Sequence, residues 1–163
     1  MRITNRLRFG AGAVMLVGAA CLLNLNLARA QGVSETQKEG DYTFTLKILP
    51  AEAFTGPNAT MERESGAEPN LLVSPTHPNH HMVVFITQNG KVLEDANVEI
   101  RYRHLGLKSG PWMNLPVVRM YEIGKGPETT HYGNNLTLNA GTYQVDVTIG
   151  RNPPVTFHVT VKS

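Results

Sequence analysis

Cysteine is nearly absent from the chain. Its 163 residues include a single cysteine, Cys21, which lies in an N-terminal segment that we expect to be removed. Without a second thiol no disulfide framework can hold the chain together, and without Cys21 no thiolate can serve as a metal ligand. A hydrophobic core must therefore supply the stability. About 130 residues follow that segment, which is enough for one domain with a sizeable core.

Helical periodicity and familiar catalytic motifs are also missing. No window shows a convincing helical spacing of apolar residues, and no internal repeat is present. The chain after the N-terminal segment has no Gly-x-Ser-x-Gly elbow, no glycine-rich phosphate loop and no His-Glu-x-x-His sequence. We therefore expect a binding protein and not an enzyme.

A cluster of basic residues is missing as well. The chain carries 15 Lys and Arg against 13 Asp and Glu, but four arginines lie in the first 30 residues. Removing these four from the 15 leaves 11 basic residues against 13 acidic ones, a net charge of −2. No remaining stretch of Lys and Arg could neutralise a run of phosphates, so we expect no nucleic-acid partner.

The N-terminal segment has the pattern of an export signal. Residues 1–8 contain three arginines and no acid, residues 9–27 are mostly apolar, and Ala28-Arg29-Ala30 is a small-x-small cleavage pattern. We predict a signal peptide of residues 1–30 that is cleaved after Ala30. The protein would then be periplasmic, with no stable membrane insertion.

Two alternatives compete with cleavage after residue 30. The apolar run is nearly long enough to span a membrane as an anchor, but Asn24 and Asn26 interrupt it. A lipoprotein signal ending at Cys21 is less well supported, because Gly18 stands where an aliphatic residue is expected.

Apolar and polar residues alternate with the period of strands in the rest of the chain. Residues 31–40 are polar and predict a flexible leader, and residues 50–69 predict a long loop. The expected strands are 42–48, 71–73, 81–87, 98–103, 115–123, 136–138, 142–149 and 155–161. Many short strands separated by turn signals predict an all-β fold over residues 41–163, an antiparallel two-sheet immunoglobulin-like sandwich.

Histidine is concentrated in one place. Three of the six histidines lie within five residues, in His77-Pro78-Asn79-His80-His81, and Met82 follows at once. His131 opens a second motif, His131-Tyr132-Gly133-Asn134-Asn135. Imidazole and thioether are the ligand mixture that suits copper, above all Cu(I).

Strand geometry suggests how these side chains group. Residues two apart on a strand share a face, so His80 and Met82 point one way while His81 points the other way with Val83. We therefore predict that His80, Met82 and His131 bind one metal jointly. The alternative is that the histidines make ordinary hydrogen bonds and that Met82 is a core residue.

The order of these segments resembles the periplasmic copper-binding proteins associated with bacterial high-affinity ferrous-iron transport. The resemblance covers roughly residues 80–149 and is carried by the strand from His80, the methionine strand ending at Met120, the His131 to Asn135 motif and Gly141-Thr142-Tyr143. It implies an immunoglobulin-like sandwich that binds copper, with Met120 as the nearest match to the family's methionine.

The chain departs from that family in two ways. The family carries a His-x-Glu pair on the early strand, so either His80 and Met82 or His81 and Val83 take those places, and the second option loses a ligand. A later histidine of the family's site has no clear match.

These observations lead to two functional hypotheses. The first is an exported metal-binding accessory of metal uptake or handling, which holds copper or iron and works with an inner-membrane metal transporter. The second is a non-catalytic immunoglobulin-like interaction or structural module whose histidines are incidental. The candidate metal ligands are His80, His81, Met82, Met120 and His131.

Overall fold

The computed structural model describes residues 32–52, 61–63, 77–122 and 124–162. Within these ranges the secondary structure consists of strands and one short 3-10 helix, η2 (Pro127–Thr129). The strands are β1 (Val33–Glu39), β2 (Tyr42–Pro50), β3 (Met61–Arg63), β4 (His80–Gln88), β5 (Lys91–Val92), β6 (Val98–Leu105), β7 (Met113–Leu115), β8 (Val118–Glu122), β9 (His131–Leu136), β10 (Gly141–Ile149) and β11 (Val155–Val161). The predicted all-β class is confirmed.

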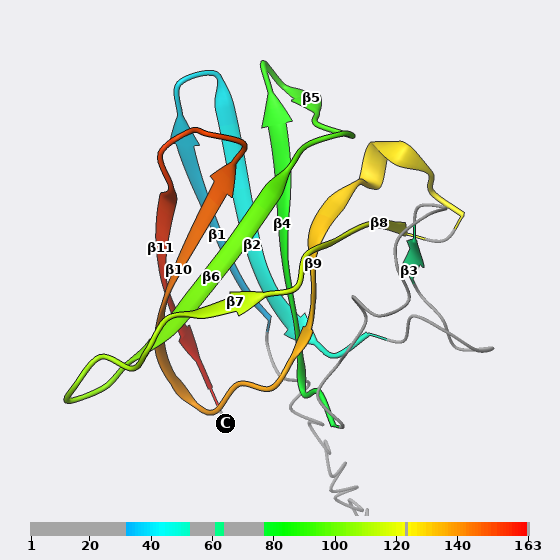
Figure 1. Cartoon of the computed structure of the whole chain (residues 1–163). Helices are drawn as coiled ribbons and strands as arrows, with labels where there is room; N and C mark the ends of the chain where they lie inside the picture. Colours follow the sequence, from blue (N-terminus) through cyan, green and yellow to red (C-terminus); the bar gives the residue numbers. More distant parts are fainter. Residues whose placement is uncertain (1–31, 53–60, 64–76, 123, 163) are drawn as a thin grey trace, which may run out of the picture.

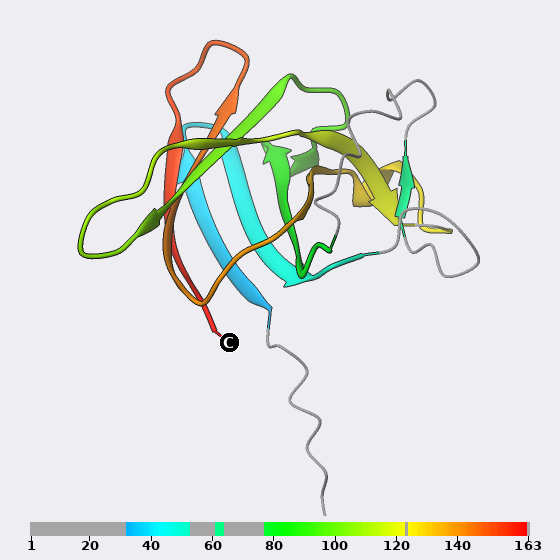
Figure 2. The same cartoon turned by 60° about the horizontal axis from the view of Figure 1, so that its bottom comes forward.

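Two antiparallel sheets form the predicted sandwich. The first has the order β1-β2-β4-β9-β8-β3, with β5 paired to β4, and the second has the order β11-β10-β6-β7. In Figure 1 strands β6 and β10 of the second sheet cross in front of β1, β2 and β4 of the first. Figure 2 shows β1 beside β11, where Gln37 Nε2 donates a hydrogen bond of 2.7 Å to the carbonyl of Thr156. The two sheets are therefore joined along one side.

The core lies between the sheets and follows from the strand alternation. Buried apolar residues alternate with partly exposed ones along β2, β6 and β11, as the sequence predicted. The inward residues of β10 are Tyr143, Val145 and Val147, and they pack in one cluster with Met82, Val84 and other apolar side chains of the first sheet. Burying such side chains is the main force that holds the two sheets together.

The prediction of a flexible leader at residues 31–40 is wrong for residues 33–39. Residues 33–39 form β1, which pairs with β2 from Val33↔Ile48 to Glu39↔Tyr42 after a turn at Gly40 (φ 56°). Only Val33 of this strand packs against the core. Main-chain hydrogen bonds to β2 hold β1 in place. Its side chains do not alternate between apolar and polar, which is the pattern by which strands are recognised in a sequence.

Three further expectations need correction. Residues 61–63 lie in the predicted loop but form β3, which pairs with β8. The strand expected over 115–123 is two strands, because the chain passes from the second sheet to the first at Pro116, which has no N–H for a ladder hydrogen bond. The strand expected at 136–138 is also wrong in its bounds: the strand here is β9, His131–Leu136, and residues 137 and 138 lie after its end. The signal peptide of residues 1–30 and the strand at 71–73 lie outside the described residues.

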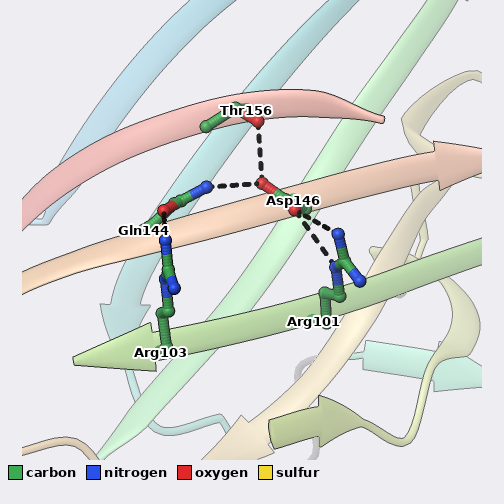
Figure 3. A network of polar contacts seen from close by, with 5 residues as sticks. All are labelled: Arg101, Arg103, Gln144, Asp146 and Thr156. Atoms are coloured by element: carbon green, nitrogen blue, oxygen red, sulfur yellow. Dashed lines mark hydrogen bonds and ion pairs between the residues drawn. The ribbon is translucent and has the colours of Figure 1, made fainter. Parts of the chain in front are cut away.

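A polar network covers part of the outer face of the second sheet (Figure 3). Arg101 donates to Asp146 Oδ2 at 3.1 and 2.8 Å, while Thr156 and Gln144 donate to Oδ1 at 2.7 and 3.2 Å. Burial alone would raise the pKa of Asp146, but these hydrogen bonds and the nearby guanidinium lower it overall. Both oxygens of the Asp146 carboxylate thus accept hydrogen bonds from other side chains of the second sheet.

Strand β9 differs from β2, β6 and β11, in which buried and more exposed residues alternate. It lies in the first sheet between β4 and β8, and all six of its residues are buried. Since alternate residues of a strand point to opposite faces, both faces of the sheet are covered here. Polar side chains in this strand therefore lie in a place from which water is excluded.

Candidate metal centre

Two histidine rings meet on the face of the first sheet that points away from the second. His81 comes from β4 and His131 from β9; their ring centroids are 6.1 Å apart and their planes meet at 89°. The two residues are 0% and 1% exposed. The pairing of His81 with Asn135 places residues 131, 133 and 135 of β9 on the same face as His81.

A methionine lies next to the second ring. Met120 of β8 is the direct cross-strand partner of His131, and such partners have Cβ atoms about 5 Å apart on one face. The Met120 side chain is fully buried and clusters with Val83 and Val118, against which Phe85 packs. Two imidazoles and one thioether therefore share a small apolar environment.

Asn135 determines which nitrogen of His81 carries the proton. The amide of Asn135 is oriented by Glu52, whose N–H donates to Oδ1 at 3.1 Å and whose carbonyl accepts from Nδ2 at 2.7 Å. Asn135 Oδ1 also lies 3.0 Å from His81 Nδ1. Because this oxygen can only accept, Nδ1 of a neutral His81 must donate, and its lone pair is at Nε2.

His131 has the same protonation pattern. Its Nδ1 donates to the carbonyl of Thr129 at 2.8 Å, and Thr129 is fixed in turn by its hydroxyl, which donates to Gly126 at 2.8 Å and accepts from the N–H of Glu122 at 3.0 Å. His131 Nε2 is buried without a hydrogen-bond partner among the described residues. A buried acceptor of this kind is uncommon and needs a physical explanation.

Both histidines are held in the neutral form. Burial, reinforced by the nearby His131, lowers the pKa of His81 to about 4, against a smaller opposing effect of the hydrogen bond to Asn135. Burial also lowers the pKa of His131, although the Thr129 carbonyl and two nearby acidic side chains oppose it. Neutral imidazole is the form that binds metals.

The predicted grouping of His80, Met82 and His131 is wrong. His80 and Met82 lie on the opposite face of β4 from His81, and Met82 is part of the core between the sheets. The apolar side chains of β4 at 82, 84 and 86 have to face the second sheet, and the strand period then turns His81 outward. The predicted placement of His81 on the same face as Val83 is confirmed.

Of the five candidate ligands, the structure thus brings together His81, Met120 and His131. Val83 lies two residues after His81 on the same face and is 1% exposed. Of the two residue pairs left open by the sequence, His81 and Val83 is the one on the face that carries His131, and its second side chain is apolar.

The donor set can be compared with what a metal needs. Among the described residues no three His, Cys, Asp or Glu side chains are close enough to hold an ion, and the candidate for a third ligand is the thioether of Met120, the cross-strand partner of His131. Metal–nitrogen bonds of about 2 Å place two rings on one ion at most about 6 Å apart, centre to centre. The 6.1 Å between His81 and His131 lies at that limit. The residues present fit a soft ion of low coordination number.

Sequence reasoning missed the residues that orient the rings. Asn135 and Thr129 hold the two Nδ1 atoms, and Glu52 holds Asn135. The available signal was the Asn134-Asn135 doublet, since asparagine is depleted in strands and two in succession are unusual in a buried one.

No helix within the described ranges is long and apolar enough to cross a membrane. No family model and no curated protein matches the chain. Two solved structures are similar to it. A DUF4426 family protein from Pseudomonas aeruginosa PAO1 is 15% identical with a TM-score of 0.43, over 78% of this chain and 91% of that one. FetP of a uropathogenic E. coli strain is 13% identical with a TM-score of 0.44, over 82% and 96% of the two chains.

Proposed function

We propose that the protein binds one copper ion, as Cu(I), through His81, His131 and Met120. The observation that carries the proposal is His131 Nε2, a buried lone pair without a hydrogen-bond partner among the described residues, beside a second neutral imidazole. An ion placed there would satisfy this atom, and both Nδ1 protons are already directed at oxygen acceptors. Metal-binding histidines usually donate their other ring N–H to an oxygen acceptor in this way.

The surroundings favour copper over iron. Thioether and imidazole are soft or borderline ligands, whereas iron sites without sulfur clusters generally include carboxylates. The position two residues after His81 carries Val83 instead of an acid, and Val118 and Phe85 add further apolar surface. The burial of both rings disfavours the more highly charged and more strongly hydrated Cu(II).

The sequence supports a biological role for this centre. The export signal and the resemblance over residues 80–149 support an accessory of metal uptake or handling in the periplasm, which exchanges copper with an inner-membrane transporter. The centre has no group positioned for acid–base or nucleophilic chemistry among the described residues, which supports binding and transfer of the ion as the activity.

A Cu(I) titration against a competing chelator under reducing conditions tests the proposal. We expect the wild type to bind one ion per chain and His131→Ala to bind it at least about 100-fold more weakly, since a three-ligand site loses an imidazole. His80→Ala is the matched control, because His80 neighbours His81 in sequence but faces the other way. Equal affinity of His131→Ala and the wild type would refute the centre and favour the interaction-module alternative.

A methionine pair provides a second control. Met120→Leu and Met82→Leu both conserve volume in buried sites, so both should leave stability nearly unchanged. Only Met120→Leu removes a proposed ligand, and we expect only this variant to lose copper affinity. Loss of affinity in both variants would point to packing instead of coordination.

A further inference from the structure

The two adjacent histidines of β4 are each held by an asparagine in the same way. Asn135 Oδ1 accepts from His81 Nδ1 and from the N–H of Glu52, and its Nδ2 donates to the Glu52 carbonyl. On the other face Asn79 Oδ1 lies 2.7 Å from His80 Nδ1 and accepts from the N–H of Leu138 at 2.9 Å, while its Nδ2 donates to the Leu138 carbonyl at 2.8 Å.

In both cases one amide bridges the N–H and the carbonyl of a single distant residue. The bridge fixes which end of the amide is oxygen, and that oxygen then requires a proton on Nδ1 of the histidine. The two clamps differ in their surroundings: His81 is buried beside His131, whereas His80 is partly exposed.

We infer that Asn135 is a positioning residue for the proposed copper centre: it holds His81 in the tautomer that carries the ring lone pair on Nε2, the atom that would bind the ion. The inference rests on the proposed function. A neutral histidine without such an acceptor exchanges between its two tautomers, and the form protonated at Nε2 cannot bind through that atom. His131 is oriented by the main-chain carbonyl of Thr129, so Asn135 is the orienting group that a substitution can remove.

The Asn135 amide has two separable parts. Asn135→Asp keeps an oxygen acceptor for His81 Nδ1 but loses the donor to the Glu52 carbonyl. Asn135→Ala loses both parts. If the acceptor is what matters to the ion, the aspartate variant keeps most of the affinity and the alanine variant does not.

The first test measures the tautomer in metal-free wild-type protein, by long-range proton–nitrogen correlation NMR of the imidazole nitrogens. The His81 signals are assigned by their loss in His81→Gln. We expect a proton at Nδ1 of His81 in the wild type and in Asn135→Asp, and a mixture of tautomers in Asn135→Ala. Because the wild-type measurement needs no folded variant, a proton found at Nε2 overturns the inference directly.

The second test is a Cu(I) titration of the same proteins and of Asn79→Ala. We expect Asn135→Ala to weaken binding by about 10- to 100-fold, the usual effect of removing an outer-shell partner, with recovery to within a few-fold in Asn135→Asp. Asn79→Ala removes an equivalent clamp and should leave the affinity unchanged. Unchanged affinity in Asn135→Ala, or an equal loss in Asn79→Ala, overturns the inference while the proposed function stands. If the wild type binds no Cu(I), the proposed function falls and the inference with it.

Discussion

Gly133→Ala is expected to lower the free energy of unfolding by about 4 kcal/mol, a large share of the roughly 5–15 kcal/mol of an ordinary domain. A Cβ atom at this position would lie 2.0 Å from the carbonyl oxygen of Met82 and 2.8 Å from the Cα of Val83. Both atoms are main chain of the neighbouring strand β4, so no rotamer change relieves the overlap, and β4 and β9 have to separate. Urea unfolding followed by circular dichroism measures the loss.

Gly106→Ala is the control for this substitution. A Cβ atom there meets nothing closer than 3.5 Å, so we expect its effect to stay within about 0.5 kcal/mol of zero. If Gly133→Ala unfolds at the same urea concentration as Gly106→Ala, the close approach of β4 and β9 is not a feature of the protein in solution.

The position of Gly133 also bears on the metal centre. It lies between His131 and Asn135 on the face that carries both histidine rings, and it pairs with Val83 on one side and Val118 on the other. A glycine here lets β4 approach β9 closely, and the separation of the His81 and His131 rings depends on the spacing of these two strands.

The sequence was sufficient to predict the core and the face on which each residue of a strand lies. Tyr143, Val145 and Val147 alternate with polar residues, and this pattern alone assigns them to the inside of a sandwich. The same rule separated His81 from His80 and Met82. Hydrophobic alternation has a period of two, and it carries this information within one strand.

The partners of each strand could not be predicted in the same way. Alternation specifies a face but gives no register between strands distant in sequence, so it could not tell whether His131 lies across from His80, His81 or Met120. In the structure Asn134 Nδ2 of β9 donates at 2.9 Å to the carbonyl of Pro116, where the chain passes from the second sheet to the first. Asn135 and Glu52 are 83 residues apart, and no local pattern indicates a contact of that range.

Stability should also depend on pH because of the buried rings. The pKa of His81 is about 4 in the folded protein and about 6.5 for an exposed histidine. Between these values the unfolded chain binds a proton that the folded chain does not, so lowering the pH favours unfolding. The stabilisation is complete above pH 6.5 and lost by pH 4, a change of about 3 kcal/mol. His131, whose pKa is also lowered, acts in the same direction.

We therefore expect the free energy of unfolding of the metal-free protein to fall by about 3 kcal/mol or more between pH 7 and pH 4. Urea unfolding at several pH values, with a chelator present, measures it. His81→Gln should be less stable at pH 7 but lose much less on acidification, since its side chain does not titrate. Asp146, whose pKa is lowered from 3.8, loses its contribution only at more acid pH, so it does not disturb this window. Parallel pH profiles for the wild type and His81→Gln would show that His81 titrates normally and is not held neutral in the fold.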